Sequence, residues 1–266
     1  MKYAIVNSER QEAQPNIPGT CPCCGSPVIA KCGEIRMHHW AHRGMCDPWW
    51  EGETEWHRDW KGLFPKEWQE IVHFAENGEK HIADVKTDQG YIVELQHSYI
   101  KSEEVKSRED FYKNMIWIVD GKRRLRDKAK FMDIWGQSHS IDNKVQARKV
   151  WEYFFDESAL LRDWGNSHTS VFFDFGENML YGLLPKSFLP NTIKERRYVF
   201  GITRNDLLSY LLPTSPLRFE ALLKGLNDFL IAKEALSSLR NSQPQQAKQL
   251  ASQLGVMDDH PLKKRK

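Results

Sequence analysis

The sequence lacks any long apolar run. No hydrophobic segment approaches the roughly 18–20 residues that a membrane-spanning helix needs, and the apolar part of residues 1–8 is too short for a secretory signal and predicts a first strand. A strong net charge is missing as well, because 38 Lys and Arg residues oppose 36 Asp and Glu residues. We therefore expect a cytoplasmic protein without a membrane partner, in which any nucleic-acid contact comes from local basic clusters.

Cysteine is scarce and unevenly placed. All five cysteines lie between residues 21 and 46, a crowding that suits metal ligation in a reducing compartment better than a disulfide framework. A CxxC and an HxxH spacing predict a tetrahedral Zn²⁺ site with the ligands Cys21, Cys24, His39 and His42. Cys46 is the alternative to His39 as the fourth ligand. Four protein ligands leave no open position for water, so we expect a structural zinc.

We assign residues 1–50 to a zinc-ribbon-like module with a hairpin formed by residues 28–31 and 34–37. Over residues 51–130, the hydrophobic pattern predicts a core in the order helix, three-stranded meander, helix, strand. The expected fold class is therefore α+β with an α/β core, and Ser102 is predicted to cap the second helix. The expected core elements are a helix at 53–64, strands at 70–75, 81–86 and 91–97, a helix at 103–114 and a strand at 115–119.

Signals weaken beyond the core. Residues 131–240 are assigned to an accessory, mostly helical subdomain, through which a homodimer or a partner protein could be joined. Residues 241–266 are rich in Gln and Ser and end in a basic run at 263–266, which predicts a flexible tail. The expected accessory elements are helices at 146–164, 206–212 and 219–239 and a hairpin of 171–175 with 180–184.

Acidic side chains lie inside otherwise apolar strands of the predicted core. Residues two apart in a strand share a face, so Glu94 and Gln96 project together from the third strand, and Asp84 projects from the second. Buried carboxylates are costly unless a partner compensates them, and a divalent cation is a usual partner. The pair predicts a Mg²⁺ or Mn²⁺ site that activates water beside a phosphodiester, with Gln96 holding the water or the phosphate.

Two alternatives stay open for these carboxylates. Asp84 and Glu94 could face solvent on a half-exposed sheet, where they would need no cation. Glu70, at the head of the first strand, is either a third carboxylate of the catalytic site or a surface residue.

Short segments shared with a known family point in the same direction: residues 21–24, 39–42, 53–57 with Lys61, 83–85, 94–98, 108–112 and 116–119. They resemble the competence protein CoiA-like nuclease family over about residues 1–121. The resemblance implies a zinc-ribbon-like N-terminus, a PD-(D/E)XK (restriction-endonuclease-like) core, Asp84 and Glu94 as metal ligands, and DNA, with single-stranded DNA as one option, as the substrate. Gln96 stands where many such nucleases have a lysine, so the positive charge comes from elsewhere or the activity is weak.

Side chains on the two predicted core helices could contact a phosphate. Arg108 and Tyr112 are four residues apart and share a helix face. His57 and Lys61 have the same spacing in the first helix, and His57 is also a candidate catalytic residue. The alternative for Arg108 and His57 is an ordinary surface position.

Two further groups could bind nucleic acid. The basic run at 122–130, which includes Arg123 and Arg124, could contact a substrate backbone, or it could be a solvated face. Tryptophans crowd the junction between the zinc module and the core, where they could stack bases, although a hydrophobic seam is the favoured interpretation. They are Trp40, Trp49, Trp50, Trp56, Trp60 and Trp68.

Three functions are compatible with these patterns. The leading one is a Mg²⁺-dependent DNA endonuclease or exonuclease for DNA uptake, recombination, phage-related DNA processing or defence. The second is a catalytically inactive, zinc-containing nucleic-acid-binding protein, supported by the missing lysine. The third, a zinc-ribbon interaction protein, leaves the phased residues Asp84, Glu94 and Gln96 unexplained.

Overall fold

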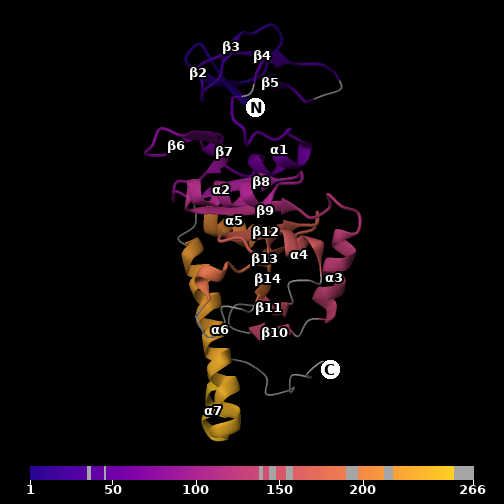
Figure 1. Ribbon diagram of the computed structural model, residues 1–266, viewed down its shortest axis with the longest axis vertical. Helices are drawn as coiled ribbons and strands as arrows, with labels where there is room; N and C mark the ends of the chain where they lie inside the picture. The colour runs from indigo at the N-terminus through magenta and orange to yellow at the C-terminus, as the bar shows by residue number, and fades with distance from the viewer. Residues whose placement is uncertain are drawn as a thin grey trace. The chain divides into compact units, whose positions relative to one another are not determined.

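The computed structural model describes residues 1–34, 37–44, 46–137, 140–143, 148–153, 158–189, 197–212 and 218–254. The chain divides into two compact units, Met1–Ile118 and Val119–Lys266. Both units combine helices with strands (Figure 1), so the expected mixed α and β composition is confirmed.

The first unit begins with a small antiparallel sheet in the order β2-β1-β3-β4-β5. Its core is built around Trp40, which is 1% exposed and is packed against Gly19 so closely that a Cβ there would lie 2.9 Å from the indole ring. The strands are β1 Tyr3–Val6, β2 Glu9–Glu12, β3 Gly19–Thr20, β4 Pro27–Lys31 and β5 His39–Ala41.

The hairpin of this module differs from the predicted one. Strand β4 pairs with β5, with Ala30 opposite Trp40, and not with a strand at 34–37. Within that predicted strand, residues 35 and 36 lie outside the described part of the chain. Trp40 in the middle of β5 is buried in the core of the module, and this burial fixes β5 beside β4. The local sequence pattern at residues 28–37 does not include Trp40, so it could not predict this pairing.

The rest of the first unit follows the predicted order of helix, three strands, helix and strand. A capping box at Thr54 and His57 starts the first helix, and Pro65 follows its end. The predicted Ser102 cap is wrong, because the N-cap is Lys101, which makes no side-chain capping bond. The elements are α1 Glu55–Gly62, η1 Lys66–Trp68, β6 Gln69–Phe74, β7 Lys80–Lys86, β8 Ile92–Gln96, α2 Ser102–Tyr112 and β9 Met115–Asp120.

These strands lie in the order β6-β7-β8-β9. The turn between β7 and β8 closes with Gly90 at φ 82°, a conformation that favours glycine, and it sets Val85 opposite Val93. One residue further along each antiparallel strand, Asp84 therefore faces Glu94. Strand β9 is buried along its whole length, as expected for an interior strand.

In its described residues, the second unit contains five strands, β10 to β14, where a mostly helical region was expected. They lie in the order β10-β11-β14-β13-β12. The predicted helix at 146–164 is a strand, β11, followed by the short helix α4, because Val150 is buried in a pairing with Phe200 of β14. The strands are β10 Ser140–Asn143, β11 Arg148–Tyr153, β12 Ser170–Asp174, β13 Met179–Leu183 and β14 Arg197–Thr203.

The predicted hairpin of β12 and β13 is confirmed, with Phe172 opposite Gly182. The expected helices at 206–212 and 219–239 are also observed, as α5 and α6. The helical elements of this unit are α3 Asp127–Gln137, α4 Ala159–Trp164, η2 Lys186–Phe188, α5 Arg204–Leu211, α6 Phe219–Ser242 and α7 Pro244–Leu254.

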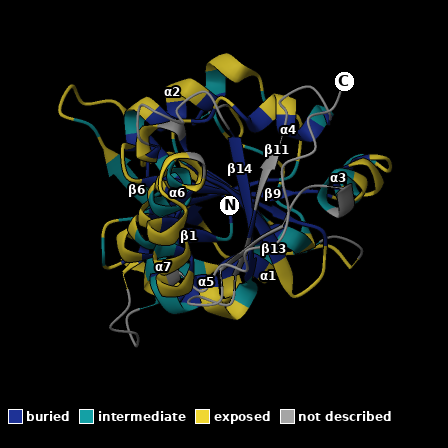
Figure 2. Cartoon of the chain, turned by 90° about the horizontal axis from the view of Figure 1, so that it is seen from below, coloured by how far each residue is buried: buried dark blue, intermediate teal, exposed yellow. Residues whose placement is uncertain are grey.

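Helix α7 lies where a flexible tail was predicted. It packs on α6 through Leu236, Ala247 and Ala251, and both helices carry wide exposed faces (Figure 2). The basic run at 263–266 lies outside the described residues. None of the helices in the described part of the chain combines the length and hydrophobicity that a membrane span needs.

Candidate metal centre and acidic cavity

Among the described residues, four side chains that could ligate a metal ion come together in the N-terminal part of the first unit. A sulfur or a ring nitrogen from each of them lies within 4.8 Å of the others. The Cys21 and Cys46 sulfurs are 3.8 Å apart, and the Cys21 sulfur accepts a hydrogen bond from the Cys23 backbone N–H. The group consists of Cys21, Cys24, His42 and Cys46.

The donor set fits Zn²⁺. Three thiols and one imidazole are a usual structural zinc set. His42 Nε2 is buried without a hydrogen-bond partner, which suits a nitrogen that ligates a cation. Burial raises the pKa of the Cys21 and Cys46 thiols, so a bound cation would be needed to favour their thiolate forms. Hydrogen bonding to Ser26 lowers the pKa of Cys24 to about 7.

The predicted ligand set needs one correction. His39 is not part of the group, because its Nδ1 pairs with the Met37 carbonyl at 2.9 Å. Cys46, the alternative fourth ligand, takes its place. Cys23 and Cys32 are not among the four residues whose ligand atoms lie together.

A second site lies in the same unit, at the predicted carboxylate pair. Asp84 Oδ2 accepts a hydrogen bond from the Leu95 N–H at 3.0 Å, and Glu94 Oε1 accepts one from the Asp84 N–H at 3.3 Å. Both side chains line one cavity of about 70 Å³. The two carboxylates therefore converge on the same space, and Asp84 is the more accessible, with 24% of its side chain exposed.

Arg108 is the immediate counter-ion of Glu94. Its Nη1 lies 3.0 Å from Glu94 Oε2, and its Nη2 donates to the Trp49 carbonyl at 2.7 Å. Burial and the charge of Asp84 raise the pKa of Glu94 to about 8, although Arg108 opposes this shift. Arg108 was predicted to contact a phosphate, but in this structure its guanidinium is paired with Glu94, Glu104 and the Trp49 carbonyl.

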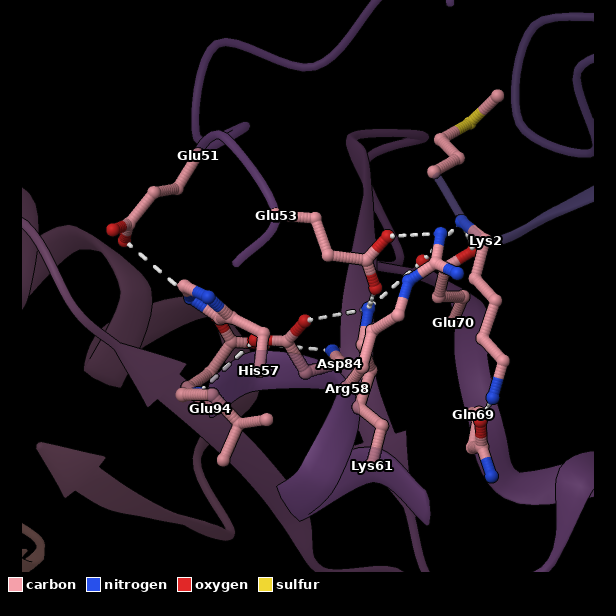
Figure 3. A network of polar contacts seen from close by, with 12 residues as sticks. Lys2, Glu51, Glu53, His57, Arg58, Lys61, Gln69, Glu70, Asp84 and Glu94 are labelled. Carbon is pink, nitrogen blue, oxygen red and sulfur yellow. Dashed lines mark hydrogen bonds and ion pairs between the residues drawn. The ribbon is translucent and has the colours of Figure 1, made fainter. Parts of the chain in front are cut away.

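Lys61 forms the other positive edge of the cavity (Figure 3). Its Nζ lies 2.5 Å from Glu53 Oε1, 2.9 Å from Glu70 Oε1 and 3.8 Å from Asp84 Oδ1. Burial lowers the pKa of Lys61, but attraction by Glu70, Asp84 and Glu53 outweighs burial and raises it above the usual value. Lys61 thus stays protonated beside the carboxylate pair.

Glu70 lines the same cavity, but its oxygens are already bound. They accept hydrogen bonds from the backbone N–H groups of Lys2 and Tyr3 and from Lys61. Burial raises its pKa, but Lys61 and these N–H groups outweigh it and lower the pKa to about 2. Glu70 therefore joins β6 to β1 and α1, which leaves it little capacity for a cation.

His57 is buried in α1 and faces the cavity. Its Nδ1 accepts from the Thr54 N–H at 3.2 Å, so Nε2 is the ring nitrogen that carries a proton. That nitrogen lies 4.0 Å from Glu51 Oε2 (Figure 3). His57 thus offers a proton donor toward the cavity.

Glu51 and Glu53 are site residues that the sequence patterns missed. Glu51 accepts hydrogen bonds from Gln96 Nε2 at 2.7 Å and from the Ser98 N–H at 2.6 Å. Because Gln96 Nε2 donates to Glu51, Gln96 Oε1 is the free end, and it is buried without a partner. Both glutamates precede α1. Glu53 lies in the segment 53–57 that carries the family resemblance, and this is the signal that could have singled it out; Glu51 lies just outside that segment.

Tyr112 brings an unpartnered hydroxyl to the cavity. The residue is 4% exposed, lines the cavity, and its OH has no hydrogen-bond partner. Burial raises its pKa, so the hydroxyl stays protonated and can donate to a ligand.

Arg123 and Arg124, which were predicted to contact nucleic acid, belong to the second unit, where Arg124 is paired with Asp127 and Asp163.

Comparison with known proteins bears on the metal centre. The family model described as competence protein CoiA, N-terminal domain, matches residues 8–47. The chain is CoiA-like at its N-terminus. The matched stretch contains all four residues of the Cys and His group. Of the residues that line the acidic cavity, it contains only Asp47. No curated protein and no solved structure matches the chain.

A short segment connects the CoiA-like N-terminal domain to the acidic cavity. Asp47, next to Cys46, accepts from His81 Nδ1 at 2.8 Å and from the Ile82 N–H at 2.9 Å. The Trp49 ring stacks on His81 with centroids 3.3 Å apart, and the Trp49 carbonyl accepts from Arg108. The segment 47–49 therefore ties the metal centre to strand β7 and to Arg108.

The tryptophans near this junction fall into different classes. Trp40 is 1% exposed and belongs to a cluster against which Val72 and Ile82 of the core strands pack, and Trp49 is stacked on His81, which agrees with the predicted seam. Trp60 is 2% exposed within α1. Trp50 is 61% exposed. Only part of the group therefore serves as seam, and Trp50 presents its ring to solvent.

Proposed function

We propose that this protein is a metal-dependent nuclease that hydrolyses phosphodiester bonds of DNA. The observation that carries the proposal is the pairing of Asp84 and Glu94, which project from adjacent strands into one cavity. Among the described residues, no third Cys, His, Asp or Glu completes a compact ligand group with them. Two carboxylates suffice for Mg²⁺, which usually keeps several waters and takes further oxygens from phosphate groups.

Asp84 and Glu94 would hold the cation. A bound Mg²⁺ or Mn²⁺ would supply Lewis-acid chemistry there: it would polarise the phosphodiester and would lower the pKa of a water that could serve as the nucleophile. Gln96, predicted to hold the water or the phosphate, does not line the cavity; it donates to Glu51, which does, so its role would be to position Glu51. The Tyr112 hydroxyl can donate to a phosphate oxygen, and His57 directs its Nε2 proton toward Glu51.

Positive charge at the site comes from residues other than Gln96. Lys61 Nζ lies 3.8 Å from Asp84, and Arg108 Nη1 lies 3.0 Å from Glu94. A fixed positive group in a buried site stabilises negative charge that develops in the transition state. Lys61 and Arg108 therefore offer the charge that the lysine of a PD-(D/E)XK core would supply.

One observation favours a second candidate, a nucleic-acid-binding protein without catalysis. Lys61 and Arg108 already neutralise much of the negative charge of the carboxylate pair, and a carboxylate with a buried counter-ion binds a cation less readily. In that case the CoiA-like N-terminal domain and the metal centre would serve binding alone.

Cleavage of labelled DNA distinguishes these functions. Single-stranded and double-stranded DNA, with RNA in parallel, are incubated with zinc-loaded protein in Mg²⁺, in Mn²⁺ or without added divalent cation. We expect Mg²⁺- or Mn²⁺-dependent cleavage of DNA that falls about 100-fold or more in Asp84→Asn and in Glu94→Gln, because a metal contributes several kcal/mol to the transition state.

The matched control is Asp88→Asn, which changes an exposed carboxylate in the turn between β7 and β8. It should cleave at the wild-type rate. Equal activity in wild type, Asp84→Asn and Glu94→Gln would contradict the catalytic assignment. DNA binding without cleavage under every condition would favour the binding protein.

A further inference from the structure

A larger cavity adjoins the acidic one in the first unit. Its volume is about 200 Å³, whereas about 10–15 Å³ of such space is enough for one water. Most of its walls are apolar or aromatic side chains together with the imidazole of His39. The lining also includes His42 and Cys46 of the candidate zinc group, so the cavity borders the metal centre as well. The two cavities share the residues Met1, Asp47, Trp50 and Ile82.

Trp50 stands at the boundary between the two cavities. It lines both of them and is 61% exposed. Its backbone N–H donates to the Asp47 carbonyl at 3.2 Å, and the Asp47 carboxylate is itself held by His81 and Ile82. The backbone of Trp50 is therefore positioned, while its ring is left open to a ligand.

We propose that this cavity binds a nucleobase of the strand whose phosphate lies in the acidic cavity, with the base stacked on Trp50. This inference rests on the proposed nuclease function, because the acidic cavity supplies the phosphate end of the ligand. A nucleotide joins a flat aromatic base, whose face can stack on an aromatic side chain, to a phosphate, which matches an aromatic-lined cavity beside a cation site. The proposed ligand is accordingly a nucleotide unit of DNA.

The proposal also predicts that the bound DNA is single-stranded. A base inside a duplex is stacked and paired, and it costs a few kcal/mol to extract it. A base of single-stranded DNA is free to enter the cavity. Stacking on an aromatic ring tolerates any base, so the cavity selects unpaired nucleotides without selecting a sequence.

The test combines a change in the protein with a change in the ligand. Binding is measured by fluorescence anisotropy with two labelled ten-nucleotide strands, oligo-dT and a strand of abasic nucleotides, in Ca²⁺ to slow cleavage. Stacking of one base is worth about 1–3 kcal/mol, so Trp50→Ala should weaken oligo-dT binding by about 5- to 160-fold. Its effect on the abasic strand should be less than two-fold.

Two control variants sharpen the result. Trp50→Phe keeps an aromatic face and should restore most of the affinity for oligo-dT. Phe74→Ala removes another exposed ring, 63% exposed, that lines neither cavity, and it should leave binding unchanged. A duplex of the same sequence should bind more weakly than oligo-dT to the wild type and lose less through Trp50→Ala.

Failure of this inference is distinguishable from failure of the nuclease proposal. If Trp50→Ala weakens both strands equally, or neither, the base site is wrong even when the wild type cleaves DNA. If the effect is confined to oligo-dT but no cation supports cleavage, the base site stands and the nuclease proposal fails.

Discussion

Glu70 shows how one buried carboxylate can join three elements. It lies in β6, accepts from two N–H groups next to or within β1, and forms an ion pair with Lys61 of α1. Its pKa is lowered to about 2 because these donors outweigh the cost of burial. Glu70 therefore stabilises the fold beside the cavity. Glu94 differs, because its pKa is raised to about 8, so an added cation would stabilise its charged form the most.

Replacement of Glu70 should reveal this role as a dependence on pH. Glu70→Gln removes one partner of a buried ion pair and should lower the free energy of unfolding at pH 7 by about 3–5 kcal/mol. Because the folded-state pKa of Glu70 lies below its unfolded value, its contribution is present above about pH 4.5 and is lost as the pH falls toward 2. Urea denaturation at pH 7 and pH 3 measures both effects.

Glu67→Gln is the control for this change, since Glu67 is an exposed glutamate three residues earlier. It should alter stability by less than about 0.5 kcal/mol. A difference between wild type and Glu70→Gln that is the same at pH 7 and pH 3 would contradict the assigned pKa shift.

At the scale of elements, the metal centre depends on how strands end. Cys21 and Cys24 follow β3 and precede β4, and His42 follows β5 directly. His39 lies inside β5, where its ring pairs with the Met37 carbonyl. The chain after β5 brings Cys46 back to the group, which a spacing rule applied to the histidines alone does not anticipate.

Metal content should follow this geometry. Cys46→Ser removes a sulfur from the group and should lower the zinc content of purified protein from about one equivalent to a small fraction, because a structural site needs its full ligand set. His39→Ala should retain about one equivalent. Elemental analysis after dialysis measures the zinc content of both variants. Loss of zinc from His39→Ala with retention in Cys46→Ser would show that His39, and not Cys46, is the fourth ligand.

At the scale of the whole molecule, the chain forms two compact units, and the metal centre and the acidic cavity both belong to the first. The segment 47–49 links them through Asp47, His81, Trp49 and Arg108 to Glu94. A metal bound by Cys46 would therefore restrain residues that position the carboxylate pair.

Removal of the metal should increase amide exchange in β7. Chelation of zinc should raise the amide exchange rate of Ile82, whose N–H is held by Asp47, about ten-fold or more. The hairpin of β12 and β13 in the second unit has its own buried side chains and should exchange as before. Hydrogen–deuterium exchange read by NMR gives both values, and an equal rise in both places would argue for general unfolding instead.

The sequence by itself determined the features that depend on local spacing. The crowded cysteines indicated a metal centre, and the alternation in β7 and β8 placed Asp84 and Glu94 on one face. The order of core elements was likewise readable, because side-chain periodicity and turn residues such as Gly90 act within a few residues. The hairpin of β12 and β13 was found for the same reason.

Only the tertiary structure decided the features that depend on contacts between distant residues. It selected Cys46 over His39, turned Arg108 toward Glu94, and placed Glu51 and Glu53 beside the carboxylate pair. It also made a strand of residues 148–153 by pairing them with β14. In each case burial against a partner far along the chain outweighed the local preference, and no window of sequence contains that partner.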